Sequence, residues 1–117
     1  YFSFLEPICM AGIVRYQHDG KSLILFSNPH NLEGGREGTP EPGKSRTRNN
    51  VSVKISRDEG QTWPVSKALE PGPSMYSDIA VTQKGKILCF YGSSNKPGFA
   101  GSGLTLARFN LEWLEQP

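Results

Sequence analysis

The stretch from Ser56 to Trp63 constrains the fold of this chain more than any other feature. It reads S-R-D-E-G-Q-T-W and fills all five fixed positions of the pattern S-x-D-x-G-x-T-W. Gly60 supplies the positive φ that a tight turn needs, and the Asp58 carboxylate can accept backbone N–H groups across the turn. The Thr62 hydroxyl can do the same more weakly, while the tryptophan ring can fill the space between neighbouring strands. The pattern therefore predicts a structural β-hairpin and not a catalytic centre.

Apolar or alternating segments on both sides of this hairpin predict an all-β fold. The predicted strands are 13–16, 23–27, 51–56, 65–69, 77–81, 87–91 and 104–109. Segment 23–27 is apolar almost throughout, which indicates a strand buried on both faces. In 51–56 the valines and the isoleucine face one way, and Ser52, Lys54 and Ser56 face the other. Turns are expected at 18–20 and 83–86, and a helical turn at 112–114.

Size and composition limit what such strands can build. The 117 residues suffice for one small domain, and 13 Gly and 9 Pro favour many turns. The chain begins at Tyr1 and not at Met, so we expect a fragment, a processed chain or an excised region. A net charge of +2 is too small to indicate nucleic-acid binding. No apolar run approaches the roughly 20 residues of a membrane helix.

The order of strands predicts part of a β-propeller. Four successive antiparallel strands over approximately 11–69 form one blade that includes the turn at 56–63. A partial last blade over approximately 76–109 has only three strands, and its fourth would come from the other end of a longer chain. About one and a half to two blades cannot close a propeller of about 4–8 blades, so the remaining blades are the expected partner. The polar segment 28–47 is either a functional loop or a disordered one.

Neither the cysteines nor the histidines form a metal-binding pattern. Cys9 and Cys89 lie in apolar surroundings without a C-x-x-C pair, so they are either buried free thiols or a single disulfide. His18 and His30 are expected in surface loops, and no acidic or cysteine partner completes a ligand set. We expect no metal and no organic cofactor.

The segments around the hairpin resemble those of exo-α-sialidases. The pattern at 56–63 is the Asp-box of sialidases and related β-propellers. L-F-S-N-P at 25–29, the arginine-bearing strand 48–56, E-P-G-P-S-M-Y-S-D at 70–78 and the last strand at 106–114 are each similar to sialidase segments. The resemblance covers nearly the whole chain. It implies that residues 1–117 are the C-terminal part of a six-bladed catalytic propeller.

The resemblance implies two site residues. Tyr76 matches the tyrosine nucleophile, and Arg48 matches the third arginine of the triad that binds the substrate carboxylate. Arg46 is the alternative, because a register slip of two residues keeps the same strand face. Guanidinium groups can bind a carboxylate in bidentate fashion. A neutral tyrosine avoids the repulsion that an Asp or Glu nucleophile would meet from that carboxylate, and sialidases are exceptions to two-carboxylate glycosidase chemistry for this reason.

Other parts of the family site have no counterpart in this chain. The glutamate base, the aspartic acid and the other two arginines lie upstream in the family, and no residue is assigned to them. Tyr91-Gly92 stands where the family often has Tyr-Glu, and that glutamate orients the first arginine. Asp78 is expected to position backbone or neighbouring side chains, and the glycosylation sequon at 50–52 is expected to be accidental because it lies in a strand.

The resemblance implies an exo-α-sialidase that hydrolyses terminal α-linked sialic acids of glycoconjugates with retention of configuration. The isolated chain is expected to be inactive, because most of the pocket is missing and cooperating catalytic residues are strongly non-additive. A non-catalytic sialoside-binding propeller and a purely structural Asp-box propeller remain alternatives. Linkage preference, hydrolysis versus transfer, and the compartment stay open: the family includes secreted, periplasmic, lysosomal and membrane-associated proteins.

Overall fold

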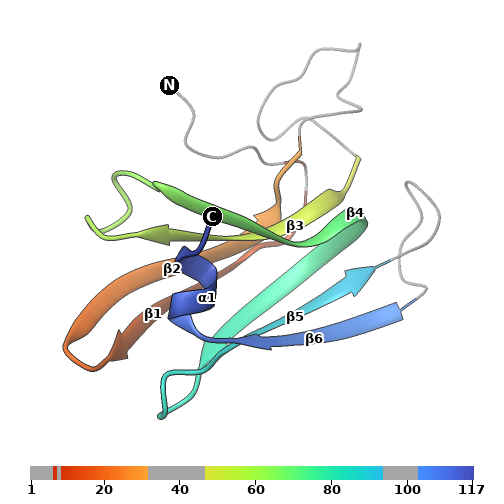
Figure 1. The fold of residues 1–117 in the computed structure, drawn as a ribbon. Coiled ribbons are helices and arrows are strands. Elements are labelled where there is room, and N and C mark those ends of the chain that lie inside the picture. The colour runs from red at the N-terminus through yellow and green to blue at the C-terminus, as the bar shows by residue number, and fades with distance from the viewer. Residues whose placement is uncertain (1–6, 8, 32–46, 94–102) are drawn as a thin grey trace.

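In the part of the chain that the structure describes, the fold consists of six strands and one short helix (Figure 1). The computed structural model describes residue 7 and residues 9–31, 47–93 and 103–117. The elements are β1 (Gly12–His18), β2 (Lys21–Pro29), β3 (Asn49–Ser56), β4 (Val65–Val81), β5 (Ile87–Ser93), β6 (Gly103–Phe109) and α1 (Leu111–Glu115). Every neighbouring pair is antiparallel, and the sheet order is the chain order. The all-β prediction is confirmed, and α1 covers the predicted helical turn.

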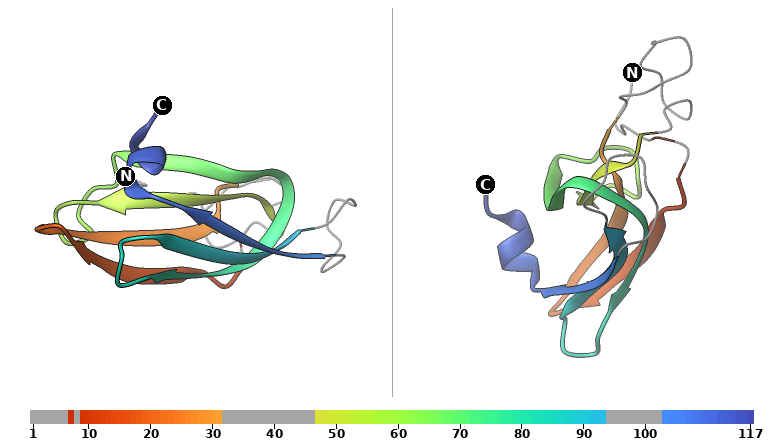
Figure 2. Two further views of the ribbon diagram at one scale, coloured as in Figure 1. Left: turned by 60° about the horizontal axis from the view of Figure 1, so that its bottom comes forward. Right: turned by 90° about the vertical axis from the view of Figure 1, so that its right-hand side faces the viewer.

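The strand β4 joins two halves of the sheet. The sequence predicted separate strands at 65–69 and 77–81, which is wrong: β4 is one strand of 17 residues. Its first half pairs with β3 and its second half with β5. Pro71 does not end the strand, because the register of the β3–β4 ladder shifts beside it and a proline at such a bulge breaks no ladder bond. Figure 2 shows β4 curving round one side, so that the sheet curls into a half-barrel.

The core lies inside this curl. Its side chains come from all strands but β6 and from α1, and they are Tyr16, Leu23, Leu25, Val51, Val53, Ile55, Ile79, Ile87, Cys89, Tyr91, Leu111 and Leu114. The helix starts at Asn110, whose Oδ1 accepts a hydrogen bond of 2.9 Å from the Trp113 N–H. This cap satisfies one of the donors that a helix start leaves without an intrahelical partner. It thereby orients α1 so that its two leucines pack on the core.

The strand β3 is buried on both faces. Its valines and isoleucine enter the core, as predicted, but the opposite face is also covered. Lys54 is only 1% exposed, and its Nζ donates a hydrogen bond to Asn28 Oδ1 on β2. The hydrogen bond partly compensates the cost of burying a cation. Nothing in the 51–56 pattern distinguishes this buried lysine from a solvated one.

The turns hold the strands in register. Asp19 and Gly20 both have positive φ and connect β1 to β2, as a two-residue hairpin turn requires. The predicted hairpin at 83–86 connects β4 to β5. The two histidines only partly match the predicted surface loops: His18 ends β1, His30 does follow β2 outside any strand, with its N–H bonded to Asn50 O at 2.9 Å, and both are half-buried. The prediction failed in part because polar neighbours in the sequence do not report cross-strand packing.

Gly12 marks a close approach of β1 to the second half of β4. A Cβ atom at this position would lie 2.9 Å from Ser27 Oγ, 3.0 Å from Asp78 Cα and 3.0 Å from Ile79 N. Close backbone approach is a typical reason for glycine inside a strand. Beside it, the hydroxyls of Ser27 and Ser77 share a hydrogen bond of 2.9 Å. These contacts fix the second half of β4 against β1 and β2.

Candidate active site

The Asp-box forms the turn between β3 and β4 as the pattern predicted. Gly60 has φ +88°, and Glu59 beside it has φ +59°. Asp58 Oδ1 accepts the Thr62 N–H at 2.8 Å, and Ser56 Oγ accepts the Gly60 N–H at 2.8 Å. The Thr62 hydroxyl donates to Asp58 Oδ2 at 2.5 Å, whereas the sequence had suggested that it accepts backbone N–H groups. The carboxylate is the stronger acceptor, so the hydroxyl serves as its donor.

Two further observations support a structural role for the box. Hydrogen bonds from the side chain and backbone of Thr62 lower the pKa of Asp58 to about 2, because they favour the charged carboxylate. Trp63 Nε1 donates to Gly60 O at 3.1 Å, and its ring meets Phe26 of β2 edge-on at 5.9 Å between centroids. A carboxylate used in this way holds a turn together and is not available for proton transfer to a substrate.

Arg48 and Tyr76 lie side by side at the opposite end of β3 from the Asp-box. Arg48 directly precedes β3 and is half-buried, and Tyr76 lies in the second half of β4 with 46% of its surface exposed. The Arg48 Cζ atom is 4.6 Å from the centroid of the Tyr76 ring, within the range of a cation–π contact. The structure thus brings together the two site residues that the sequence singled out, 28 positions apart. Arg46, the alternative arginine, lies outside the described residues.

An open apolar cavity of about 390 Å³ borders Tyr76. It is lined by Met10, Met75, Tyr76, Ser77, Asp78, Phe90, Tyr91, Gly92 and Leu104. The segment before β1 thereby reaches the site, since Met10 lines the cavity. Cys9 is also near the site: burial raises the pKa of its thiol, and the positive charge of Arg48 partly opposes this effect. Sequence reasoning missed both residues, because no motif links them to Tyr76.

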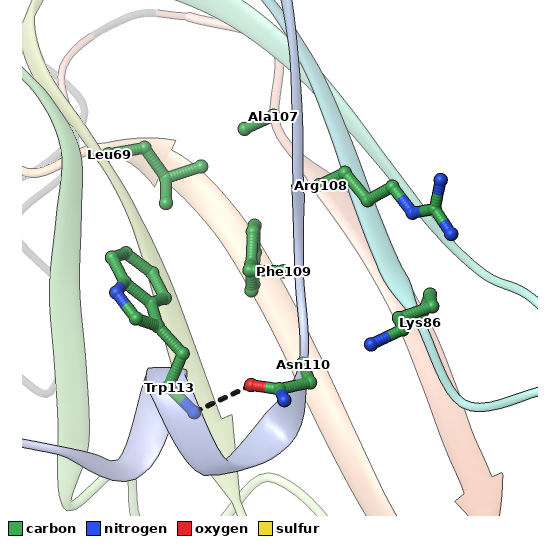
Figure 3. A pocket seen from close by; sticks show the side chains of 7 residues that line it. All are labelled: Leu69, Lys86, Ala107, Arg108, Phe109, Asn110 and Trp113. Carbon is green, nitrogen blue, oxygen red and sulfur yellow. Dashed lines mark hydrogen bonds between the residues drawn. The ribbon is translucent and has the colours of Figure 1, made fainter.

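A larger hollow, of about 530 Å³, lies elsewhere, between the first half of β4, β6 and α1 (Figure 3). In Figure 3 the side chains of Leu69, Phe109 and Trp113 converge on it, while Arg108 points away. Lys67 Nζ lies 4.0 Å from the centre of the Trp113 ring and donates to the Trp113 O atom at 2.8 Å. These contacts pack α1 onto the sheet. Neither Tyr76 nor Arg48 lines this hollow, so its larger size does not make it the candidate site.

The structure also places the remaining residues of the site region. Asp78 Oδ1 accepts a hydrogen bond of 2.9 Å from the N–H of the next residue, Ile79, as expected of a residue that positions backbone. A Cβ at Gly92 would lie 3.0 Å from Met75 Cγ, so a glutamate here would require Met75 to move. Asn50 Oδ1 accepts the Gly72 N–H at 2.9 Å, which agrees with an accidental sequon. Loop 28–47 falls outside the described residues except at its ends.

Both cysteines are free thiols. Cys89 is fully buried, and burial raises its pKa to about 11, while Cys9 is half-buried. Across the described ranges, no cluster of His, Cys, Asp and Glu could hold a metal ion. Within the same ranges, no helix is long and apolar enough to cross a membrane.

Comparisons with known proteins agree on one class. No family model matches the chain. A sialidase of Micromonospora viridifaciens is 32% identical over 115 residues, which are 93% of this chain and 15% of the relative. A sialidase of Bacteroides fragilis is 31% identical over 96 residues, 76% of this chain and 15% of the relative. A Vibrio cholerae sialidase is 39% identical over 70 residues, 59% of this chain and 8% of the relative.

A solved structure, the Hadza microbial sialidase Hz136, superposes on 95% of this chain and 19% of its own with a TM-score of 0.68 and 27% identity. The curled antiparallel sheet with its Asp-box is therefore part of a β-propeller. Within that class, the chain is a sialidase-like segment. It spans only 15% of the length of the Micromonospora and Bacteroides relatives.

Proposed function

We propose that this chain is the C-terminal part of the catalytic propeller of an exo-α-sialidase that hydrolyses sialylated glycoconjugates. In this proposal the blade at approximately 11–69 carries Arg48 and the partial last blade at approximately 76–109 carries Tyr76. Tyr76 is the nucleophile and Arg48 binds the substrate carboxylate. The proposal extends to the whole protein what is known of relatives that carry the name sialidase.

The observation that carries the proposal is the 4.6 Å contact between Arg48 and Tyr76. In a sialoside the carboxylate is bonded directly to the anomeric carbon. A group that binds the carboxylate and a nucleophile that attacks that carbon must therefore lie next to each other. Arg48 and Tyr76 meet this condition, and Tyr76 borders the open cavity described above.

The residues support a two-step reaction with retention. Tyr76 Oη attacks the anomeric carbon as the bond to the leaving oxygen breaks, and water then cleaves the tyrosyl–sialyl bond, as in other retaining glycosidases. A free tyrosine has a pKa of about 10 and needs a base to become nucleophilic at neutral pH. That base and the acid for the leaving group are expected in the other blades. Arg48 holds the carboxylate and so orients the carbon toward Tyr76.

The test is release of a fluorescent aglycone from an α-sialoside by the full-length protein that contains this chain. The Tyr76→Phe variant should lose at least about 1000-fold in kcat, since removal of a nucleophile eliminates the covalent route. Tyr16→Phe is the matched control, because within the described part of the chain its buried hydroxyl makes a single hydrogen bond, to Gly85 O at 3.5 Å. Turnover that survives in Tyr76→Phe would refute the proposed mechanism. A proton NMR spectrum of the first product separates retention from inversion.

One observation keeps a second function in view. Gly92 occupies the position of the family glutamate, and a Cβ there would lie 3.0 Å from Met75 Cγ, so a larger side chain would require Met75 to move. A propeller with a poorly oriented first arginine would bind sialosides without cleaving them. Sialoside binding by the full-length protein without turnover, in the wild type and in Tyr76→Phe alike, would establish this function instead.

A further inference from the structure

The strands β3 and β4 are irregular beside Arg48. Asn49 pairs with Pro73, but Val51 pairs with Glu70, so one residue of β3 lies opposite two of β4. Asn50, the single β3 residue at this bulge, has φ +62°, and Gly72, one of the two β4 residues opposite it, has φ +96°. β-Bulges are frequent next to active sites, where they re-aim a side chain.

The ladder between β4 and β5 is irregular at Tyr76 itself. Ser74 pairs with Ser93 and Ser77 pairs with Tyr91, so three steps along β4 oppose two along β5. The in–out alternation breaks at the same place, since Ser74 and Met75 are both buried while Tyr76 is exposed. Irregular pairing therefore occurs on both sides of Ser74 in β4.

Side chains satisfy the backbone groups that these bulges release. Asn50 Oδ1 accepts the Gly72 N–H at 2.9 Å. Ser74 Oγ accepts the Val51 N–H at 2.9 Å, and its own proton can go to Gly72 O at 3.0 Å or to Glu70 O at 3.3 Å. Buried backbone groups without a partner are costly. The fully buried hydroxyl of Ser74 and the amide of Asn50 therefore stabilise this backbone conformation by supplying those hydrogen-bond partners.

The same groups tie Arg48 to the strand of Tyr76. The Ser74 N–H donates to Arg48 O at 3.1 Å, two residues before Tyr76. On its other side, Asn50 O accepts the His30 N–H at 2.9 Å and the Ser52 hydroxyl at 2.8 Å. The backbone of Arg48 is therefore held through Ser74, and the bulge next to it through Asn50.

We propose that Asn50 and Ser74 are positioning residues that set the Arg48 guanidinium over the Tyr76 ring and thereby against the substrate carboxylate. This inference rests on the function proposed above. It assigns neither residue a contact with substrate. Displacing a binding group by about 1 Å can cost on the order of 100-fold in rate, so loss of either side chain should act on substrate affinity through Arg48.

A double-mutant cycle in the full-length protein tests this. Ser74→Ala, Asn50→Ala and Asn50→Gly are each made with Arg48 present and in an Arg48→Ala background. The readouts are KM for the fluorogenic sialoside, the Kd of sialic acid by titration calorimetry, and Tm. In the presence of Arg48 each alanine variant should raise KM and Kd about 10-fold. In the Arg48→Ala background the same changes should have less than about a twofold effect, because residues that act through one another are non-additive.

The Asn50→Gly variant distinguishes the effect of the positive-φ backbone conformation from the effect of the lost side-chain hydrogen bond. It keeps a residue that accepts positive φ and removes the side chain with its Oδ1 acceptor, so its effect should lie between the wild type and Asn50→Ala. If the Ser74→Ala protein does not fold, Asn50→Gly still tests whether the bulge affects substrate affinity through Arg48. Ser56→Ala is the matched control: this buried serine holds the Asp-box at the other end of β3, so it should lower Tm and leave KM unchanged.

Additive effects in the two backgrounds, or a lower Tm with unchanged KM and Kd, would overturn the inference while leaving the sialidase proposal intact. A wild-type protein that neither cleaves an α-sialoside nor binds sialic acid would refute the proposed function, and the inference with it. The positioning inference would be supported if the effects of the Asn50 and Ser74 variants on KM and Kd depend on Arg48, while Ser56→Ala leaves KM unchanged.

Discussion

Replacement of Gly12 by alanine tests how tightly β1 and the second half of β4 are packed. The new methyl group would lie 3.0 Å from two backbone atoms of β4, at Asp78 and Ile79, and 2.9 Å from Ser27 Oγ. The serine cannot yield without losing its hydrogen bond to Ser77, and the backbone of a paired strand cannot rotate away. Overpacking of this kind costs about 1–3 kcal/mol.

Gly103 at the start of β6 provides the matched control. A Cβ there would meet only Ser93 Oγ, at 3.8 Å, which is ordinary contact. Neither glycine has φ in the left-handed region, so Gly103→Ala should stabilise by about 0.4–1 kcal/mol through the unfolded state. The two variants should therefore differ by about 1.4–4 kcal/mol. For the six-bladed propeller proposed above, about 350–400 residues at this scale, and about 2.1 cal/mol/K per residue, this is roughly 2–5 °C in Tm.

The assay is differential scanning calorimetry of the full-length protein and its two variants, with KM measured in parallel. Because Gly12 contacts the strand that carries Tyr76, Gly12→Ala should also raise KM. Equal Tm values for Gly12→Ala and Gly103→Ala would refute the reasoning, since it depends entirely on the close approach at Gly12. A lower Tm with unchanged KM would confine the effect to stability.

Three further outcomes are expected. The pKa of Asp58 is lowered on folding, so its contribution to stability is present above about pH 4 and is lost as the pH falls toward about 2. The difference in unfolding free energy between wild type and Asp58→Asn, measured by denaturant titration, should therefore shrink over that range. A constant difference would contradict the role of Asp58 in the turn. Arg48→Lys keeps the charge but loses bidentate geometry, and loss of a charge-assisted hydrogen bond should reduce kcat/KM about 10–100-fold; an unchanged value would remove Arg48 from the site. Cys89, buried with a pKa raised to about 11, should react with a maleimide only after unfolding; labelling of the native protein, read by mass spectrometry of its peptide, would argue against its burial.

Local rules predicted much of the fold. The Asp-box turn follows from the conformational needs of Gly60 and the acceptor strength of Asp58, which act within eight residues. The strands follow from alternation, and the hairpin turns from Asp19-Gly20 and from Gly85. The continuity of β4 could not be predicted, because Pro71 and Pro73 normally interrupt a ladder. Only the bulge formed with the distant Asn50 allows them in the strand.

The candidate site was predictable only through family resemblance. Tyr76 alone is an ordinary strand tyrosine, and Arg48 alone is one of several basic residues in 44–48. Their contact depends on the pairing of β3 with β4. The positioning contacts of Ser74 could not be predicted at all, because a buried serine and an exposed one look the same in sequence. The nearness of Met10 likewise depends on the curl of the sheet.

The continuous strand β4 has a consequence for how such a protein can be divided. Because its two halves hydrogen-bond to β3 and to β5, a cut between the two predicted blade segments passes through paired backbone and leaves both sheets with a broken strand. The turns at Asp19-Gly20 and around Gly85 can be opened without removing a ladder partner. A split-protein reporter or a circular permutant built on this segment should therefore be opened at one of these hairpins, so that β4 stays undivided within one of the two pieces.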